Sequence, residues 1–300
     1  MTEQFNVLIL GHGEMGRAIE YLLKDQHQLT IWERHPPENK KAIVLEDAAS
    51  QADIIIFCLP VNPHRVIAER IAAHIKTDCL CLSIAKGLDQ AGQTAAQIFS
   101  ECLPENNPYV LLYGPMISEE IRQGRNAFAQ LGYREKDSFN KIYHLFQDTQ
   151  LYIEPTEDIT GISWSVILKN VYALIFGMAD ELQLGDNMRG YLAVAALKEL
   201  DLIVKKMGGQ MGSSYHLAGL GDLITTATST NSHHHELGCM LAREETENIN
   251  GEGVHTLEMV KQFQHFTVAD YPLFHLIQSI VDAPKNIREK INHYLQNIYS

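Results

Sequence analysis

The sequence of 300 residues lacks an excess of basic residues: 24 lysines and arginines stand against 37 aspartates and glutamates, for a formal net charge of −13. An acidic chain repels phosphate backbones and anionic membrane surfaces, so we expect no nucleic-acid partner. No apolar run approaches the ~18 residues of a transmembrane span, and no basic region precedes the first apolar run. We therefore expect neither membrane insertion nor a signal peptide.

Cysteine is scarce as well, with five residues and no spacing typical of a metal site. Cys58, Cys79 and Cys81 lie in or beside apolar runs, which predicts buried thiols in a reducing compartment and a cytoplasmic location. The run His233-His234-His235 does not alter this expectation, because adjacent helical residues point in different directions and cannot close around one ion. We expect no metal.

Short apolar runs alternate with helical periodicity through the first half of the chain, which is typical of an α/β fold with a doubly wound parallel sheet. Strands are predicted at residues 7–10, 28–32, 54–59, 79–83, 110–113, 128–131 and 151–154, and helices at 15–23, 91–102 and 139–146. From residue 163 strand patterns vanish, and helices are predicted at 165–182, 188–207 and 279–298. We place a boundary near residue 156, with a Rossmann nucleotide-binding domain at 1–156 and an all-helical domain at 157–300.

A glycine-rich turn follows the first predicted strand and opens the first predicted helix: Gly11-His12-Gly13-Glu14-Met15-Gly16. In a dinucleotide-binding turn the first glycine permits the tight bend, the second lets a pyrophosphate approach the backbone, and the third lets the helix pack on the strand. The helix N-terminus adds partial positive charge. The alternative is a strand–helix turn without a ligand.

Two residues after the second predicted strand bear on the choice of cofactor. The carboxylate of Glu33 can accept a hydrogen bond from a ribose 2′-hydroxyl and would repel a 2′-phosphate, which favours NAD. Arg34 favours NADP instead, or stacks on the adenine.

Carbonyl reduction needs a hydride and an acid that protonates the oxygen as charge develops there. Lys169 is the candidate acid, since it lies within an apolar helical run. Lys86, at the end of the fourth predicted strand, could be a second cation, Asp222 could hold Lys169 in place, and Asn170 could orient substrate or cofactor. The alternatives are a Lys169 that extends its ammonium to solvent, a plain turn at Lys86 and a helix cap at Asp222.

Taken together, these segments make the chain resemble NAD(P)-dependent glycerol-3-phosphate dehydrogenase of the bacterial type, along nearly its whole length. The resemblance rests on Ser83-Ile84-Ala85-Lys86-Gly87-Leu88, Gly114-Pro115, Lys169-Asn170, Leu217-Ala218-Gly219-Leu220-Gly221-Asp222-Leu223 and Glu252-Gly253, in that order. It implies a second domain similar to the C-terminal domain of 6-phosphogluconate dehydrogenase, which binds substrate and forms a homodimer. It also implies a role in glycerophospholipid metabolism.

The residues and the resemblance together predict three sets of site residues. The catalytic set is Lys169, Lys86 and Asp222. The cofactor set is Gly11, Gly13, Glu14, Met15, Gly16, Glu33, Arg34, Lys86 and Glu252. The substrate set is Lys86, Gly114, Lys169, Asn170, Asp222, Thr226, Ser232, His233 and His234.

Departures from the family pattern concern the substrate most. Ser232-His233-His234 stands where the family has Ser-Arg-Asn, whose Arg and Asn hold the substrate phosphate, and Met116 stands where it usually has Ser or Thr. Ser163 replaces a Glu, and Glu14-Met15 replaces a Ser-Trp. A histidine can donate a hydrogen bond to phosphate and is partly cationic near neutral pH, which makes it a weaker and more pH-dependent ligand than a bidentate guanidinium. The histidines could also belong to a solvated polar loop, and Glu252 could be an exposed loop acid.

The sequence predicts one leading function and leaves two alternatives. In the leading function the chain reduces glycerone phosphate to sn-glycerol 3-phosphate with NAD(P)H, with NAD expected and NADP as the alternative cofactor. In the first alternative it reduces another small keto or oxo-acid substrate, less anionic or without phosphate. In the second alternative it binds a dinucleotide without catalysis.

Overall fold

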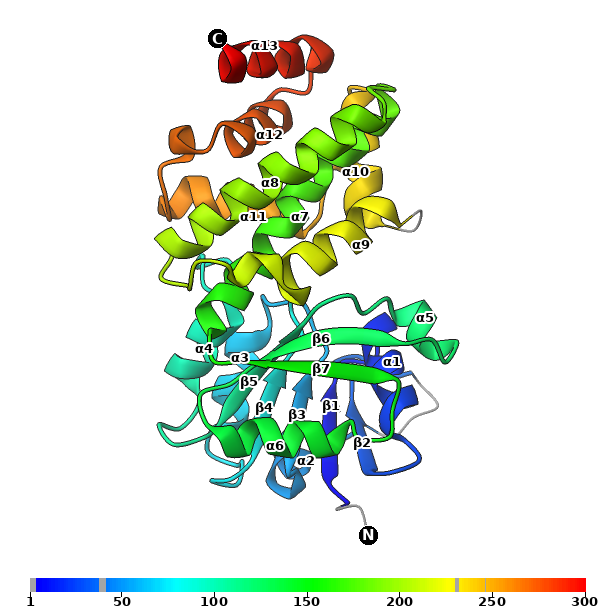
Figure 1. The fold of residues 1–300 in the computed structure, drawn as a ribbon. Coiled ribbons are helices and arrows are strands. Elements are labelled where there is room, and N and C mark those ends of the chain that lie inside the picture. Colours follow the sequence, from blue (N-terminus) through cyan, green and yellow to red (C-terminus); the bar gives the residue numbers. More distant parts are fainter. Residues whose placement is uncertain (1–3, 38–41, 230–231, 246) are drawn as a thin grey trace. The chain divides into compact units, whose positions relative to one another are not determined.

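A computed structural model of the chain describes residues 4–37, 42–229, 232–245 and 247–300 (Figure 1). The chain divides into two compact units. Unit 1 contains residues 1–89 and 93–159, and unit 2 contains residues 90–92 and 160–300. Unit 1 is built around a sheet and unit 2 from helices alone, which is the two-part α/β and all-helical architecture that the sequence predicts.

Unit 1 contains one seven-stranded sheet in the order β2-β1-β3-β4-β5-β6-β7. Its strands are β1 (Asn6–Leu10), β2 (Gln28–Trp32), β3 (Ile54–Phe57), β4 (Leu80–Ser83), β5 (Tyr109–Tyr113), β6 (Ala127–Gly132) and β7 (Leu151–Thr156). Strands β1 to β5 pair in parallel, as predicted. Strand β6 pairs antiparallel with β5 and parallel with β7, so the last two strands run the opposite way. The β5–β6 connection holds only a five-residue helix, too short for the usual helical crossover to a parallel strand.

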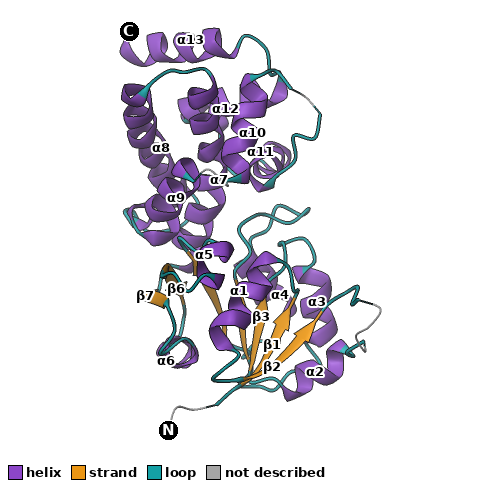
Figure 2. Ribbon diagram, turned by 90° about the vertical axis from the view of Figure 1, so that its right-hand side faces the viewer, coloured by secondary structure: helices purple, strands orange, loops and turns teal. Residues whose placement is uncertain are grey.

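Helices cover both faces of the sheet, and Figure 2 shows α3 and α6 on opposite sides. One face forms a core with Leu23, Ile121 and Leu145 from three different helices. The sheet contributes buried residues from alternate strand positions to this core, because successive side chains of a strand point to opposite faces. The helices are α1 (Glu14–Leu23), α2 (Leu45–Gln51), α3 (His64–Ile71), α4 (Ala95–Cys102), α5 (Ser118–Arg122) and α6 (Lys136–Leu145).

Local sequence sets where these elements begin. Thr94 caps α4 by accepting a hydrogen bond from the Gln97 amide while Gln97 accepts one from the Thr94 amide, so the helix begins at Ala95 and not at the predicted residue 91. Among the cysteines expected to be buried, Cys79 and Cys81 are buried free thiols, whereas Cys58 is partly exposed.

Unit 2 is organised around α7 (Ile159–Glu181), whose side chains are buried on nearly all sides. The other elements are α8 (Asp186–Lys206), η1 (Ser213–Tyr215), η2 (Leu217–Gly221), α9 (Asp222–Thr228), α10 (His233–Ala242), α11 (Glu252–Phe263), η3 (Val268–Asp270), α12 (Pro272–Asp282) and α13 (Ile287–Tyr299). By length and composition α7 could cross a membrane, so the expectation that no segment is apolar enough is wrong. However, 94% of its most apolar window is buried inside the protein, which identifies α7 as a core helix.

Two glycines allow α7 and α10 to pack with their backbones in contact. A Cβ atom on Gly177 would lie 2.0 Å from the carbonyl oxygen of His235, and one on Gly238 would lie 2.1 Å from the carbonyl oxygen of Leu174. This close crossing holds the first turn of α10 against the second half of α7.

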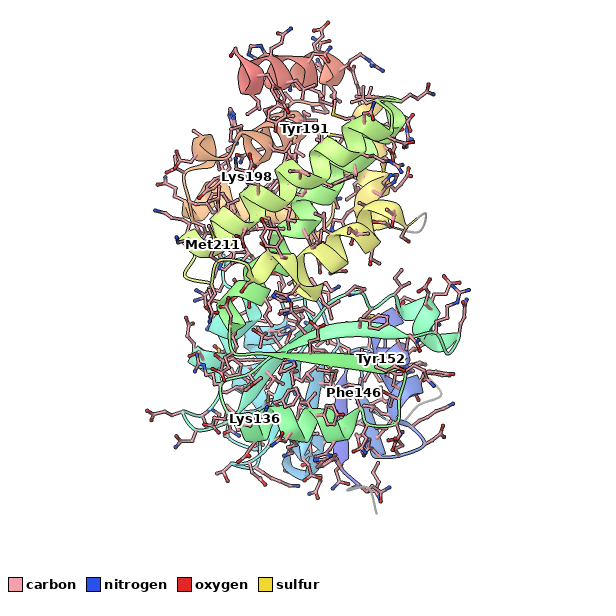
Figure 3. The ribbon with its side chains drawn as sticks, in the orientation of Figure 1. Lys136, Phe146, Tyr152, Tyr191, Lys198 and Met211 are labelled. Atoms are coloured by element: carbon pink, nitrogen blue, oxygen red, sulfur yellow. The ribbon has the colours of Figure 1, made fainter. Side chains whose placement is uncertain are left out.

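The predicted single helix at 279–298 is wrong. The structure breaks it after Asp282, because Pro284 cannot donate a backbone hydrogen bond and Asn286 adopts a left-handed conformation with φ of 53°. Lys290 of α13 caps the end of α12 by donating to the carbonyl oxygens of Ser279 and Ala283. Tyr191 lies on α8 (Figure 3), and its hydroxyl, 3.0 Å from that of Tyr294 on α13, links these two helices.

Candidate functional site

The glycine-rich turn joins β1 to α1, and two of its glycines are required by the turn itself. Gly11 has φ of 93°, and a Cβ atom on it would lie 2.8 Å from the carbonyl oxygen of Cys58. A Cβ atom on Gly16 would lie 2.1 Å from the carbonyl oxygen of Gly11. Gly13 differs, because a Cβ atom there would meet nothing within 4 Å.

The space beside Gly13 lies at the start of α1, where Gly13 is the N-cap residue and no side chain caps the helix. Uncapped amide groups and the helix dipole favour an anion at such a position. The turn therefore fits the pyrophosphate of a dinucleotide.

Two side chains of this turn have partners within unit 1. The carboxylate of Glu14 lies 2.5 Å from the guanidinium groups of Arg17 and of Arg122 on α5. The hydrogen bond from Arg17 and the charge of Arg122 lower the pKa of Glu14. Met15 packs against the hydrophobic core. Glu14 therefore brings a negative charge to the turn, offset by two cations.

The end of β2 carries the residues expected to choose between cofactors. Glu33 directly follows Trp32, the last residue of β2, and is half-buried, whereas Arg34 is exposed. Strand β2 is hydrogen-bonded to β1, so Glu33 follows the strand next to the one that leads into the glycine-rich turn.

Lys86 and Gly114, both predicted substrate residues, lie together in unit 1. The Lys86 ammonium donates to the carbonyl oxygen of Gly114 at 3.2 Å. A Cβ atom on Gly114 would lie 2.5 Å from the carbonyl oxygen of Phe128, so glycine is required there. Met116 is 7% exposed and belongs to the hydrophobic core. Packing in this core accounts for an apolar side chain at Met116, and an effect of Met116 on the substrate stays a prediction.

Unit 2 buries Lys169 in the middle of α7. Its side chain is 6% exposed, and its ammonium lies 3.1 Å from Asp222 Oδ2. Lys169 also donates to Thr226 Oγ1 at 2.7 Å, and that hydroxyl donates to the backbone carbonyl of Asp222 at 2.7 Å. The interpretation in which Lys169 extends to solvent is therefore wrong. A buried charge must be paired, and Asp222 and Thr226 supply the pairing.

The position of Asp222 follows from the local backbone. Residues 217–221 form a π-helical turn, η2, which leads directly into α9. Gly219 is required in this turn, because a Cβ atom there would lie 2.2 Å from the carbonyl oxygen of Ser214. Asp222 is the first residue of α9, and its side chain faces Lys169, while the N-cap residue of α9 is Gly221. The alternative of Asp222 as a helix cap is therefore excluded.

Asn170 joins α7 to the start of α11. Its side-chain amide donates to Glu252 Oε2 at 3.0 Å. Glu252 is half-buried and begins α11, so it is not an exposed loop acid. The next residue, Gly253, has to be glycine, since a Cβ atom there would lie 2.5 Å from the carbonyl oxygen of Asn170.

The three adjacent histidines begin α10 and have three different partners. His233 Nε2 lies 2.9 Å from the carbonyl oxygen of Asn250, and His234 Nε2 accepts a hydrogen bond from the Gly253 amide at 3.3 Å. His235 Nε2 lies 2.6 Å from Asp180 Oδ2. Ser232 is the N-cap of the helix and accepts from the His235 amide. A role for His233, His234 or Ser232 in phosphate binding stays a prediction.

Within the described ranges, no group of three or more histidine, cysteine or acidic side chains could hold a metal ion. Sequence reasoning also passed over one buried residue beside the motif at 83–88. His64 is fully buried and contacts Ser83, and a single histidine after a proline gives no recognisable signal in the sequence.

A Rossmann-like sheet with an open glycine-rich turn, followed by an all-helical unit with a buried lysine, defines the class of two-domain, dinucleotide-dependent oxidoreductases. Residues 37–138 match the family described as NAD-dependent glycerol-3-phosphate dehydrogenase N-terminus, and residues 158–292 match the C-terminus of the same family. The chain is 30% identical over 264 residues to glycerol-3-phosphate dehydrogenase (NAD(P)+) of Acaryochloris marina, covering 85% of this chain and 83% of the relative. It is 26% identical over 321 residues to the enzyme of the same name from Fusobacterium nucleatum, covering 96% of each.

The crystal structure of glycerol-3-phosphate dehydrogenase from Coxiella burnetii has the same fold, with a TM-score of 0.83 at 22% identity over 97% of this chain and 99% of that one. The chain therefore belongs to the NAD-dependent glycerol-3-phosphate dehydrogenase family. The glycine-rich turn lies before residue 37, where the family match begins, so that match does not test the assignment of the turn.

Proposed function

We propose that this protein reduces glycerone phosphate to sn-glycerol 3-phosphate, with NADH as the hydride donor and Lys169 as the acid. The observation that carries the proposal is the buried ion pair between Lys169 and Asp222. A fold needs no ion pair at such a place for stability, since a hydrophobic pair of similar size would serve as well. A role of Lys169 as the proton donor would account for this pair.

The chemistry of Lys169 follows from these contacts. The bound nicotinamide would supply the hydride that adds to the carbonyl carbon. As the carbon–oxygen double bond opens, the oxygen gains negative charge, and Lys169 donates a proton to it. The balance is ketone, NADH and one proton giving alcohol and NAD+, and Lys169 regains its proton from solvent. Asp222 keeps the ammonium form stable in a buried position, and Thr226 fixes its direction.

The family membership supports a phosphorylated substrate, and Lys86 is a cation that could contact it. We propose that His233 and His234 take part in holding the phosphate, together with Ser232 and Asn170. To do so through Nε2, His233 and His234 must exchange their present backbone partners for phosphate oxygens, and the Nε2 atom of His234 must change from acceptor to donor.

The hydrogen bond at His234 favours a second candidate function. In this structure His234 Nε2 accepts a hydrogen bond from the Gly253 amide, and while it does so this nitrogen cannot donate to a phosphate oxygen. A small keto or oxo-acid substrate without phosphate would leave the contact between His234 and Gly253 in place. A dinucleotide-binding protein without catalysis is disfavoured, because such a protein has no use for the buried Lys169–Asp222 pair.

For the cofactor we propose that residues 1–156 bind NADH through Gly11, Gly13, Glu14, Met15 and Gly16, with Lys86 and Glu252 also near it. Glu33 would prefer NADH to NADPH, with Arg34 as the residue that would reverse the preference. We further propose that residues 157–300 bind the substrate and form a homodimer in the cytoplasm, which light scattering of the purified protein tests.

A substrate panel tests the proposed function. NADH loss is followed by absorbance with glycerone phosphate, with glycerone, and with a small 2-oxo acid, and the products are identified by chromatography. We expect the highest kcat/KM for glycerone phosphate. A higher kcat/KM for glycerone or for the 2-oxo acid would instead support the second candidate function, reduction of a substrate without phosphate. NADH binding without turnover of any ketone would contradict the assignment as a reductase.

A further inference from the structure

His64 is a buried histidine with two defined partners in unit 1. It is the first residue of α3, is fully buried, and lies with its ring centre 4.9 Å from that of Phe57. Its Nδ1 atom lies 3.0 Å from the carbonyl oxygen of Pro60, and its Nε2 atom lies 2.8 Å from Ser83 Oγ. Both nitrogens of the ring are therefore hydrogen-bonded inside the protein.

The chemistry of the partners determines where each proton lies. A carbonyl oxygen can only accept, so Nδ1 carries the proton and donates to Pro60. In the neutral ring Nε2 is then an acceptor and receives the hydroxyl proton of Ser83. Burial lowers the pKa of His64 to about 4, in keeping with a neutral ring at physiological pH.

The hydroxyl of Ser83 connects the His64 ring to the backbone that follows β4. Ser83 is fully buried at the end of β4, and its oxygen accepts a hydrogen bond from the amide of Ala85 at 3.1 Å. Because the Ser83 hydroxyl donates its hydrogen bond to His64, a lone pair of the Ser83 oxygen is directed at the Ala85 amide. The conformation of Ser83 to Ala85 is thus fixed one residue before Lys86.

We propose that His64 is a positioning residue, which aims Lys86 by fixing the turn between Ser83 and Ala85. The inference rests on the proposed function, in which Lys86 contacts the substrate. Lys86 itself donates to the carbonyl oxygen of Gly114, so its ammonium occupies a defined position only if the turn before it does. In this account the contact with Ser83 serves catalysis, and the contact with Pro60 serves the fold.

Two isosteric substitutions separate the two contacts. In His64→Gln the side-chain amide reaches the position of Nε2 and keeps the contact with Ser83, and in His64→Asn it reaches the position of Nδ1 and keeps the contact with Pro60. Each variant loses one buried hydrogen bond, so we expect similar losses of stability. We expect His64→Asn to lower kcat about 10–100-fold, because a displacement near 1 Å can cost about that much. His64→Gln should stay close to the wild type, and neither should change NADH affinity.

His27 provides a matched control in the same unit. It is buried, accepts from the Phe5 amide through Nδ1 at 3.3 Å, and contacts the carbonyl oxygen of Leu145 through Nε2 at 2.9 Å. His27→Asn and His27→Gln should lower the melting temperature without a selective loss of kcat. In a Lys86→Met background, His64→Asn should lower kcat no further, because the residue it positions is absent.

Equal losses of kcat in His64→Gln and His64→Asn would overturn the inference, as would an undiminished effect of His64→Asn in the Lys86→Met background. Two readouts do not need turnover: hydrogen exchange at the Ala85 amide and the rate at which Lys86 reacts with an amine reagent, both by mass spectrometry. Both should rise in His64→Asn and not in His64→Gln. If the wild type reduces no ketone, the proposed function fails, and these two rates still decide the inference.

Discussion

Replacing Asp222 by Asn tests how much the free energy of unfolding depends on the Asp222 carboxylate as the partner of the buried Lys169 ammonium. The substitution keeps the size of the side chain and removes its charge. Lys169 then remains as an ammonium with a side chain only 6% exposed, next to an uncharged amide in place of the Asp222 carboxylate. We expect the variant to be strongly destabilised, because a buried charge that loses its ionic partner is costly.

The geometry sets the size of the effect. Two unit charges 3.1 Å apart attract by about 5 kcal/mol at an effective dielectric constant of ~20. Removing one partner of a buried pair typically costs ~3–5 kcal/mol, whereas replacing both partners with apolar residues is close to neutral. We therefore expect Asp222→Asn to cost about 3–5 kcal/mol. The double variant Lys169→Met with Asp222→Leu should recover most of that loss.

The chain offers a reporter and a matched control for this experiment. Of its two tryptophans, Trp32 lies in unit 1 and Trp164 in α7, so in a Trp32→Phe background the fluorescence of Trp164 follows the urea unfolding of unit 2. Lys261 and Asp282 form a pair at the same 3.1 Å distance with side chains 63% and 52% exposed. Asp282→Asn should cost only ~0–1 kcal/mol. If Asp222→Asn costs no more than this control, the pair is not buried as described.

Three further expectations concern the cofactor, the substrate and the pH dependence of stability. Glu33→Gln should raise the affinity for NADPH and leave that for NADH nearly unchanged in fluorescence titrations; an unchanged preference would show that Arg34 governs the ribose site. If glycerone phosphate is the substrate, His233→Arg with His234→Asn should lower its KM, because a guanidinium can bind phosphate oxygens through two parallel hydrogen bonds and an imidazole cannot. An unaltered KM would mean that these histidines do not touch the phosphate. Because burial lowers the pKa of His64 from 6.5 to about 4, the unfolded chain binds a proton that the folded chain does not. The contribution of neutral His64 is complete above pH 6.5 and should fall by about 3 kcal/mol as the pH drops to about 4, relative to His64→Gln in urea unfolding; parallel curves for the two proteins would contradict this.

Much of the fold could be predicted because buried parallel strands appear in the sequence as continuous apolar runs, such as Ile-Ile-Ile-Phe of β3. The short helices α2 and α3 could not, since seven or eight residues give too little periodicity to recognise. The reversed direction of β6 and β7 was also missed, because an apolar run gives no direction. The break after Asp282 could have been predicted from Pro284, and mixed charge on both sides concealed it.

The candidate site could be predicted where chemistry restricts the residue type. A charged Lys169 inside an apolar helix is unusual enough to identify, and the order of the surrounding motifs added Asp222. The hydrogen bonds of His233 and His234 to the backbone at 250–253 could not be foreseen, because they depend on how α10 and α11 pack on α7. The core position of Met116 likewise depends on packing, and one apolar residue in a loop does not reveal it.

The central claim is that Lys169 protonates the ketone, and single-turnover hydride transfer measures this most directly. Wild type and Lys169→Met are loaded with NADH and mixed with excess glycerone phosphate, and the decay of NADH absorbance is recorded. We expect transfer to slow by about 10²–10⁴-fold in the variant, the usual worth of a general acid, with the dissociation constant of NADH unchanged. Hydride transfer in Lys169→Met at nearly the wild-type rate would contradict the account.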